Sequence, residues 1–216
     1  MTNIITLNAD SLPIVYLCKK DKRLSKVISM VGEISYKPYD DGFAFLVHEI
    51  IEQMLSIKSG AKIYGRLKEI CNGDISPLTI DKLSDEELRA IGTSNSKANC
   101  IRSITNILLN DETYLEKLEQ LSDLDVRKQL MTIKGIGQWT SDMYLIFVLD
   151  RQDILPIGDA AFLQSYKWIY KDKDCSVDKI KKKCQKWKPY SSIASRYLYK
   201  ALDMGLTKEE FHLFKK

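Results

Sequence analysis

Apolar residues recur with the period of an α-helix along most of this chain of 216 residues. In residues 22–31, Leu24, Val27, Ile28 and Val31 lie on one helical stripe, and Gly32 follows as a stop signal. The same pattern predicts further helices over residues 43–57, 59–71, 84–91, 94–108, 122–132, 139–149, 159–170, 178–188 and 191–202. Alternation with a period of two is confined to residues 2–7 and 33–36, which are weak candidates for strands.

These elements predict an all-α fold of about ten helices. Helix-start signals support several of the boundaries. Ser84 and Glu87 have the spacing of a capping box, and Ser122 precedes another helix. Residues 139–149 are apolar on nearly every side, so we expect that helix to be buried at the centre of its domain.

Charge gives only a mild bias, because 33 basic residues face 29 acidic ones for a net charge of +4. This balance permits contact with phosphates without requiring it. The densest basic segment runs from Lys167 to Lys188 and holds nine lysines and three aspartates. We interpret it as a solvated helix face, and contact with nucleic acid is the alternative.

Cysteine and histidine usage excludes several kinds of site. The five cysteines are widely scattered without a CxxC pair, which favours reduced thiols in a cytoplasmic protein. With only His48 and His212, a histidine-based metal site or a Ser-His-Asp triad is not expected. No apolar run reaches about 20 residues and the first residues lack a secretory pattern, so we expect no contact with a membrane.

Two glycines one residue apart mark a turn between helices, in the stretch Ile133-Lys-Gly-Ile-Gly137. Glycines permit positive φ and leave backbone amides unshielded, and the amino end of a helix attracts anions. A phosphate group of nucleic acid is therefore a natural ligand. A tight turn without any ligand fits the same residues.

Asp159 follows Pro156 and Gly158 at the expected start of a helix. The position suits an N-cap, and it equally suits a carboxylate that performs catalysis. Asp150 and Asp153 are rival carboxylates in the polar link before it, and we interpret both as solvated or capping.

Several motifs together resemble one family. The stretch LMTIKGIGQWT resembles the hairpin of the helix-hairpin-helix (HhH-GPD) superfamily of DNA glycosylases, and LPIGDAA resembles its loop with the catalytic Asp. GIGQWTSDMYL is similar to the alkylpurine branch, the 3-methyladenine DNA glycosylase II type. HEIIEQMLSIKSGAKIYGRL, LSDEELRAIG and WKPYSSIASRYLYKAL extend the likeness over roughly residues 11–204.

The resemblance implies a single glycosylase unit of two helical lobes, with the hairpin and a catalytic cleft between them. Lobe one would span roughly residues 36–125. Lobe two would span roughly residues 126–216 together with an N-terminal helix at 11–32. A protein of this kind would act as a monomer on damaged double-stranded DNA.

The resemblance also assigns roles to residues. Asp159 would be the catalytic carboxylate, and Met54 would fill the gap left in the base stack. The base pocket would be lined by Trp139, Met143 and Tyr199. The amides of Gly135, Gly137 and Trp139 would contact phosphate. The backbone carbonyls of Met131, Ile133 and Ile136 would hold a monovalent cation, Na⁺ or K⁺.

The implied reaction is removal of a flipped-out alkylated purine, such as 3-methyladenine or 7-methylguanine, in base-excision repair. Trp139 stands where bifunctional relatives have a Schiff-base lysine, so cleavage of the strand is not expected. No cofactor is required, and Cys175 and Cys184 do not supply an iron–sulfur cluster.

Two departures from the family pattern, Ser191 and Tyr199, keep alternatives open. One is a DNA-binding module with weak or no catalysis, and another is the same fold acting on hypoxanthine or an oxidised base. A helical scaffold without a nucleic-acid role is the third.

Overall fold

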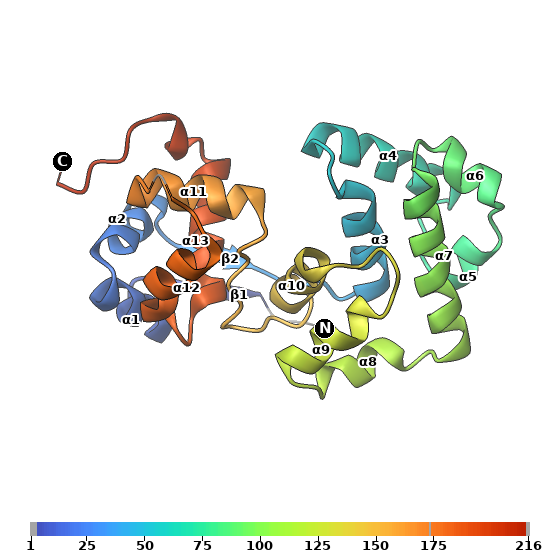
Figure 1. Ribbon diagram of the computed structural model, residues 1–216, viewed down its shortest axis with the longest axis horizontal. Helices are drawn as coiled ribbons and strands as arrows, with labels where there is room; N and C mark the ends of the chain where they lie inside the picture. The colour runs from blue at the N-terminus through green and yellow to red at the C-terminus, as the bar shows by residue number, and fades with distance from the viewer. Residues whose placement is uncertain (1–3, 173, 215–216) are drawn as a thin grey trace. The chain divides into compact units, whose positions relative to one another are not determined.

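The computed structural model describes residues 4–172 and 174–214. The described residues form thirteen α-helices, two short 3₁₀-helices and a sheet of two strands (Figure 1). The prediction of an all-α fold is confirmed. The helix number was too low because the short helices α5 (Pro77–Asp81) and α8 (Tyr114–Glu119) are too brief to show periodicity.

The chain divides into two compact units. The terminal unit comprises Met1–Pro38 with Asp150–Lys216, and the central unit comprises Tyr39–Leu149. The sequence placed a boundary near residue 125, whereas residues 126–149 belong with the central unit. The reason is the apolar helix of residues 139–149, whose buried sides pack against α3 (Gly42–Glu52) and α9 (Asp123–Met131). Its Tyr144 ring, for example, lies 6.4 Å from the ring of Phe45, centroid to centroid.

The terminal unit is built from both ends of the described chain. Its elements are β1 (Ile5–Leu7), α1 (Leu12–Lys20), α2 (Lys22–Val31), β2 (Ile34–Tyr36), α11 (Ala160–Tyr170), α12 (Val177–Cys184), η1 (Gln185–Trp187), α13 (Ser191–Asp203) and η2 (Leu206–Lys208). The blue helices α1 and α2 lie beside the orange and red helices α11 and α13 (Figure 1). The two strands pair antiparallel with Ile5 opposite Tyr36, which confirms them as strands, although residues 2 and 3 lie outside the described range.

A buried aspartate joins these segments. Asp21 caps α2 by accepting from the amides of Arg23 and Leu24, and it also accepts from the indole of Trp187 at 2.9 Å. The Tyr170 hydroxyl and the Lys186 ammonium bind the same carboxylate. Burial raises the pKa of Asp21, but these hydrogen bonds outweigh burial and lower it overall. Asp21 also breaks the expected helix at 11–32 into α1 and α2.

The central unit contains the remaining helices. Besides α5 and α8, they are α3 (Gly42–Glu52), α4 (Ile57–Ile70), α6 (Asp85–Ala90), α7 (Asn95–Asn110), α9 (Asp123–Met131) and α10 (Gln138–Phe147). The predicted helix at 43–57 was too long, because it ends at Glu52 and Met54 adopts a left-handed φ of 57°. In the terminal unit, the helix expected at 178–188 likewise ends early, at Cys184.

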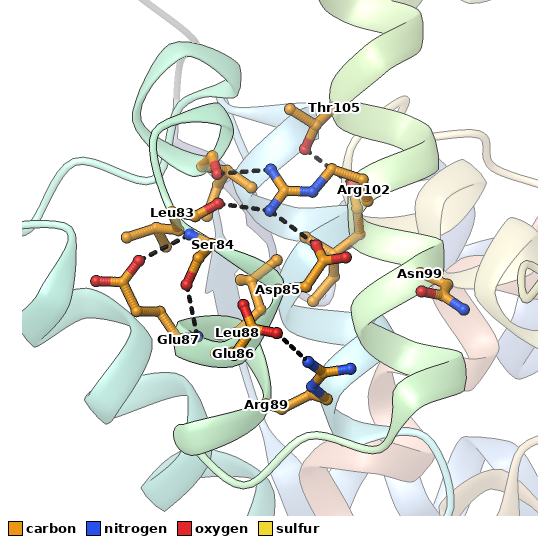
Figure 2. Close-up of polar contacts among 12 residues, drawn as sticks. Leu83, Ser84, Asp85, Glu86, Glu87, Leu88, Arg89, Asn99, Arg102 and Thr105 are labelled. Carbon is orange, nitrogen blue, oxygen red and sulfur yellow. Dashed lines mark hydrogen bonds and ion pairs between the residues drawn. The ribbon is translucent and has the colours of Figure 1, made fainter.

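The capping box is confirmed, since Ser84 and Glu87 exchange both hydrogen bonds at the start of α6 (Figure 2). Arg102 of α7 reaches the same corner and donates to the carbonyls of Ile80 and Leu83, at 3.0 and 2.6 Å. The Ile80 carbonyl also accepts from the Leu83 amide at 3.1 Å, so Arg102 adds a second donor there and ties α7 to the segment between α5 and α6. Among the described helices, none combines the length and apolar character needed to cross a bilayer.

Candidate functional site

The glycine motif forms a tight turn between α9 and α10 in the central unit. The Ile133 amide donates to Leu130 O at 3.1 Å, and the Ile136 amide donates to Ile133 O at 2.9 Å. Gly135 has a φ of +104°, and a Cβ at this position would lie 2.8 Å from Sγ of Cys100. Glycine is therefore required both by the backbone angle and by the close approach of α7.

The amino end of α10 is open to a ligand. Gly137 is the N-cap and brings no side chain that could cover or satisfy the first amides of the helix. Gly135 and Gly137 are exposed, and their amides donate to no acceptor in residues 4–172 and 174–214. Exposed amides at the positive end of a helix form a site for an anion such as phosphate.

Two polar side chains, Gln53 and Arg127, anchor the turn and the helix that follows it. Gln53, the first residue after α3, donates from Nε2 to the carbonyl of Gly135 at 3.0 Å and to Oγ1 of Thr140 at 3.0 Å. Arg127 of α9 donates from Nε to the buried carboxylate of Asp142 at 2.6 Å. Burial raises the pKa of Asp142, and the bond from Arg127 only partly offsets that rise. These contacts join the turn and the first residues of α10 to α3 and α9, which restrains the direction of the exposed amides.

Asp159 begins α11 in the terminal unit and is half-buried. Its Oδ1 accepts from the Phe162 amide at 2.7 Å, so the carboxylate is the N-cap of α11. Its own amide donates to Pro156 O at 3.0 Å, which closes the loop that precedes the helix. A carboxylate has two oxygens and about four acceptor positions. The cap occupies one of these positions and fixes the orientation of the group, so a capping role does not by itself exclude catalysis.

Comparison with known proteins places both features in one family. Residues 47–189 match the model of the HhH-GPD superfamily base excision DNA repair proteins, a range that includes the glycine turn and Asp159. The chain belongs to the HhH-GPD superfamily. The match confirms the resemblance inferred from the sequence motifs.

Solved structures agree with this assignment. The crystal structure of a DNA-3-methyladenine glycosidase from Bacillus halodurans is 32% identical, with 97% of each chain covered and a TM-score of 0.82. The 3-methyladenine DNA glycosylase of Schizosaccharomyces pombe in complex with abasic DNA is 26% identical, covers 95% of this chain and all of its own, and gives a TM-score of 0.80. DNA-3-methyladenine glycosylase 1 of S. pombe is 28% identical over 196 residues, 86% of this chain and 85% of the relative.

Within this HhH-GPD chain, Met54 lies at the tip of the link between α3 and α4. Its side chain is fully exposed, at 101% of the reference area, and the neighbouring Leu55 is 41% exposed. Met54 is therefore not part of the hydrophobic core. The exposed position is available to enter a base stack, as the family resemblance implies.

The residues expected to line the base pocket lie in both units. Trp139 and Met143 are on α10 of the central unit, where Trp139 is half-buried and Met143 is only 4% exposed. Tyr199 is on α13 of the terminal unit, half-buried and packed against its hydrophobic core. Their role as a pocket stays a prediction.

The rival carboxylates are both engaged. Asp150 pairs with Arg196 of α13 at 3.2 Å, so the interpretation of Asp150 as solvated or capping is replaced by an ion pair. Asp153 accepts from the hydroxyl of Ser191 at 2.5 Å and from its amide at 3.4 Å, at the amino end of α13. Ser191, a departure from the family pattern, is thus part of a cap for that helix.

The lysine-rich segment is largely neutralised by neighbouring carboxylates. Each of five lysines pairs with an acidic group: Lys171 with Glu210, Lys179 with Asp174, Lys183 with Asp172, Lys186 with Asp21, and Lys188 with Asp153. Two of these carboxylates, Asp172 and Asp174, belong to the segment itself. The pairing favours a structural role over contact with DNA.

One histidine cluster lies beside the α3 end. His48 has Nδ1 at 3.1 Å from Glu49 and Nε2 at 3.4 Å from Glu52. The hydrogen bond to Glu49 and both negative charges raise the pKa of His48, against burial and the charge of Lys68. A carboxylate at each ring nitrogen suits a protonated imidazolium, which accounts for the cluster without a metal ion.

Sequence reasoning missed the supports of the turn. The sequence does not mark Gln53, which binds the Gly135 carbonyl, or Lys97, which binds the carbonyl of Gln53. Neither residue carries a local signal, because the contacts that matter join α3, α7 and the hairpin across tens of residues of sequence.

Proposed function

We propose that this HhH-GPD chain is a DNA glycosylase that hydrolyses the N-glycosidic bond of alkylated purines, such as 3-methyladenine and 7-methylguanine, flipped out of duplex DNA. The observation that carries the proposal is that the family match spans both an anion-ready helix hairpin and an oriented carboxylate, Asp159. The names of relatives that cover most of this chain support alkylated bases as the substrate class.

The chemistry explains why one carboxylate suffices. A purine alkylated at N3 or N7 carries a positive charge, so the glycosidic bond breaks with its electrons neutralising the leaving base. Positive charge grows on the sugar, and water adds to the anomeric carbon. Asp159 would stabilise that charge and accept the proton of the water, leaving a free base and an abasic sugar.

The hairpin would hold the distorted DNA. Extrusion of a nucleotide costs a few kcal/mol, which contacts to the backbone must offset. The amides of Gly135, Gly137 and Trp139 would bind phosphate oxygens, and Met54 would fill the gap in the stack. Trp139, Met143 and Tyr199 would then offer π faces and a polarisable sulfur to the cationic base.

The turn also suits a monovalent cation. In the described part of the chain, no amide donates to the carbonyls of Met131 and Ile136, and the carbonyl of Ile133 accepts only one bond. Carbonyl oxygens of this kind fit Na⁺ or K⁺, which would add positive field beside the bound phosphate. The three carbonyls would hold the ion, and no other cofactor is needed.

We further propose that the enzyme is monofunctional. A lyase step needs a lysine amine that forms a Schiff base with the sugar, and Trp139 occupies that place in the motif. Borohydride should therefore trap no covalent complex on damaged DNA. A trapped complex would overturn this part of the proposal and leave base removal standing.

The direct test is release of free bases from methylated duplex DNA, with the bases identified by chromatography. The wild-type protein should release alkylated purines, and Asp159→Asn should lower the rate by about two orders of magnitude or more. Equal rates for the two proteins would remove Asp159 from the mechanism. No release by the wild-type protein, with intact binding to abasic DNA, would instead indicate a binding module.

A further inference from the structure

A lysine outside the family motifs closes the end of α3. Lys97 of α7 donates from Nζ to the carbonyl of Ile51 at 2.8 Å and to the carbonyl of Gln53 at 2.7 Å. No carboxylate in the described chain pairs with this ammonium group, so its two strong bonds go to backbone oxygens. Lys97 is half-buried, and burial lowers its pKa.

These carbonyls are the ones that the helix cannot satisfy itself. The last carbonyls of any helix lack a helical donor and carry the negative end of the dipole, so a cation is favourable there. Directly after them, Met54 adopts a left-handed φ of 57°, a conformation that is strained for a non-glycine residue. The bond to Gln53 O fixes the peptide that leads into this strained residue.

The same face of α7 also contacts the hairpin. One turn after Lys97, the side chain of Cys100 lies against Gly135, where no Cβ would fit. Gln53 also bonds the Gly135 carbonyl, so the end of α3, helix α7 and the hairpin each contact the other two. The exposed tip at Met54 and the phosphate-binding turn are therefore held by one set of contacts within the central unit.

We propose that Lys97 is a positioning residue for base extrusion, which holds the exposed Met54 tip at a fixed distance from the hairpin. This inference rests on the proposed function, since it names the residue that fixes the position of the wedge. The wedge is Met54, the side chain proposed to fill the gap in the base stack. Lys97 itself touches neither the base nor the sugar. It acts through the backbone of Gln53 and Met54.

The test compares two substrates that differ only in the need for a wedge. One duplex holds 7-methylguanine paired with cytosine, and the other holds it unpaired in a single-nucleotide bulge, where extrusion costs less. Under single-turnover conditions, Lys97→Met should release the paired base about ten- to hundredfold more slowly. Lys97→Met should release the bulged base within about threefold of the wild-type rate. A bulged nucleotide has no pairing partner, so its extrusion leaves no unpaired cytosine and no gap in the base stack.

A double-variant cycle tests the route through Met54. Met54→Ala should give a similar loss on the paired substrate, and the combined variant should be no more than about twofold worse than either alone. Additive losses, or an equal loss on both substrates, would overturn the proposal. Lys117→Met, which changes an exposed lysine on α8, is the matched control and should match the wild type.

A second readout does not depend on base release. DNA with an abasic site and 2-aminopurine beside it reports insertion of a side chain through fluorescence. Wild-type protein should change the signal, while Met54→Ala and Lys97→Met should bind and change it far less. A wild-type signal from Lys97→Met would overturn the proposal even if the protein proves inactive as a glycosylase. If Lys97→Met does not fold, Lys97→Gln, which is too short to reach both carbonyls, takes its place.

Discussion

The side-chain amide of Gln53 donates a hydrogen bond to the backbone carbonyl of Gly135, 82 residues further along the chain. A carbonyl only accepts, so the bond also fixes which way the amide group of Gln53 points. The contact ties the end of α3 to the turn before α10. The contact therefore fixes the position of the Met54 link relative to the glycine turn in the free protein. In our proposal both of these parts contact DNA.

The two glycines of the turn should respond differently to the same substitution. Gly135→Ala should destabilise the protein by about 2 kcal/mol or more, because φ is +104° and the new methyl group would meet Cys100. Gly137→Ala has an ordinary φ of −106° and open space around it, so stability should change by less than about 0.5 kcal/mol.

Binding to DNA should separate the pair further. The methyl group of Gly137→Ala would stand in front of the amides proposed to meet phosphate, so affinity for abasic duplex should fall although the fold is intact. Urea unfolding and fluorescence anisotropy measure the two properties. Unchanged affinity in Gly137→Ala would argue against phosphate contact at this turn.

Asp159 has a structural role that can be separated from chemistry. Asparagine caps a helix about as well as aspartate, while alanine lacks the acceptor. Asp159→Ala should therefore lose about 1 kcal/mol of unfolding free energy, and Asp159→Asn should lose little. Both should be poor catalysts. If alanine costs no stability in urea unfolding, the bond to the Phe162 amide does not form in solution.

Stability should fall as the pH rises through the titration of His48. The folded pKa of His48 lies above the ordinary value of 6.5, chiefly through its hydrogen bond to Glu49. The stabilisation is fully present below pH 6.5 and is lost as the pH rises through the folded pKa. Urea unfolding between pH 6 and 9 should show this decline, and His48→Gln should flatten it. His212→Gln, at an exposed histidine, is the control and should keep the decline.

The lysine-rich segment should contribute little to DNA affinity. Lys179 and Lys183 already bind Asp174 and Asp172, so replacing both with glutamine removes charges that are locally neutralised. We expect affinity for duplex to fall by less than about threefold, and the salt dependence of binding to stay nearly unchanged. A clear decrease in the salt slope would show that these lysines meet phosphates.

The fold was predictable wherever a local signal was strong. Residues 22–31 form a helix closed by Gly32, and the Ser84–Glu87 capping box forms as expected. The errors arose where tertiary contacts override periodicity. The apolar run at 43–57 looks continuous, yet the chain leaves the helix at Gln53, because Lys97 and Gly135 bind its end from elsewhere in the sequence.

The site was predictable as a set of motifs. The glycine turn and Asp159 are contiguous in sequence and mark their own positions, whereas their supports are distant. Nothing near Asp153 indicates that Ser191 will bind it, and nothing near Lys97 indicates a helix end to be capped. Such pairs depend on the packed structure.

The terminal unit has a consequence for protein synthesis. The Tyr197 hydroxyl bonds the carbonyl of Leu7 across 190 residues, and Tyr170 binds Asp21 across 149. On the ribosome, the first two helices cannot make these contacts until α11 and α13 have been synthesised. At about 5–20 residues per second, that delay lasts many seconds, during which the apolar faces of α1 and α2 are exposed to chaperones.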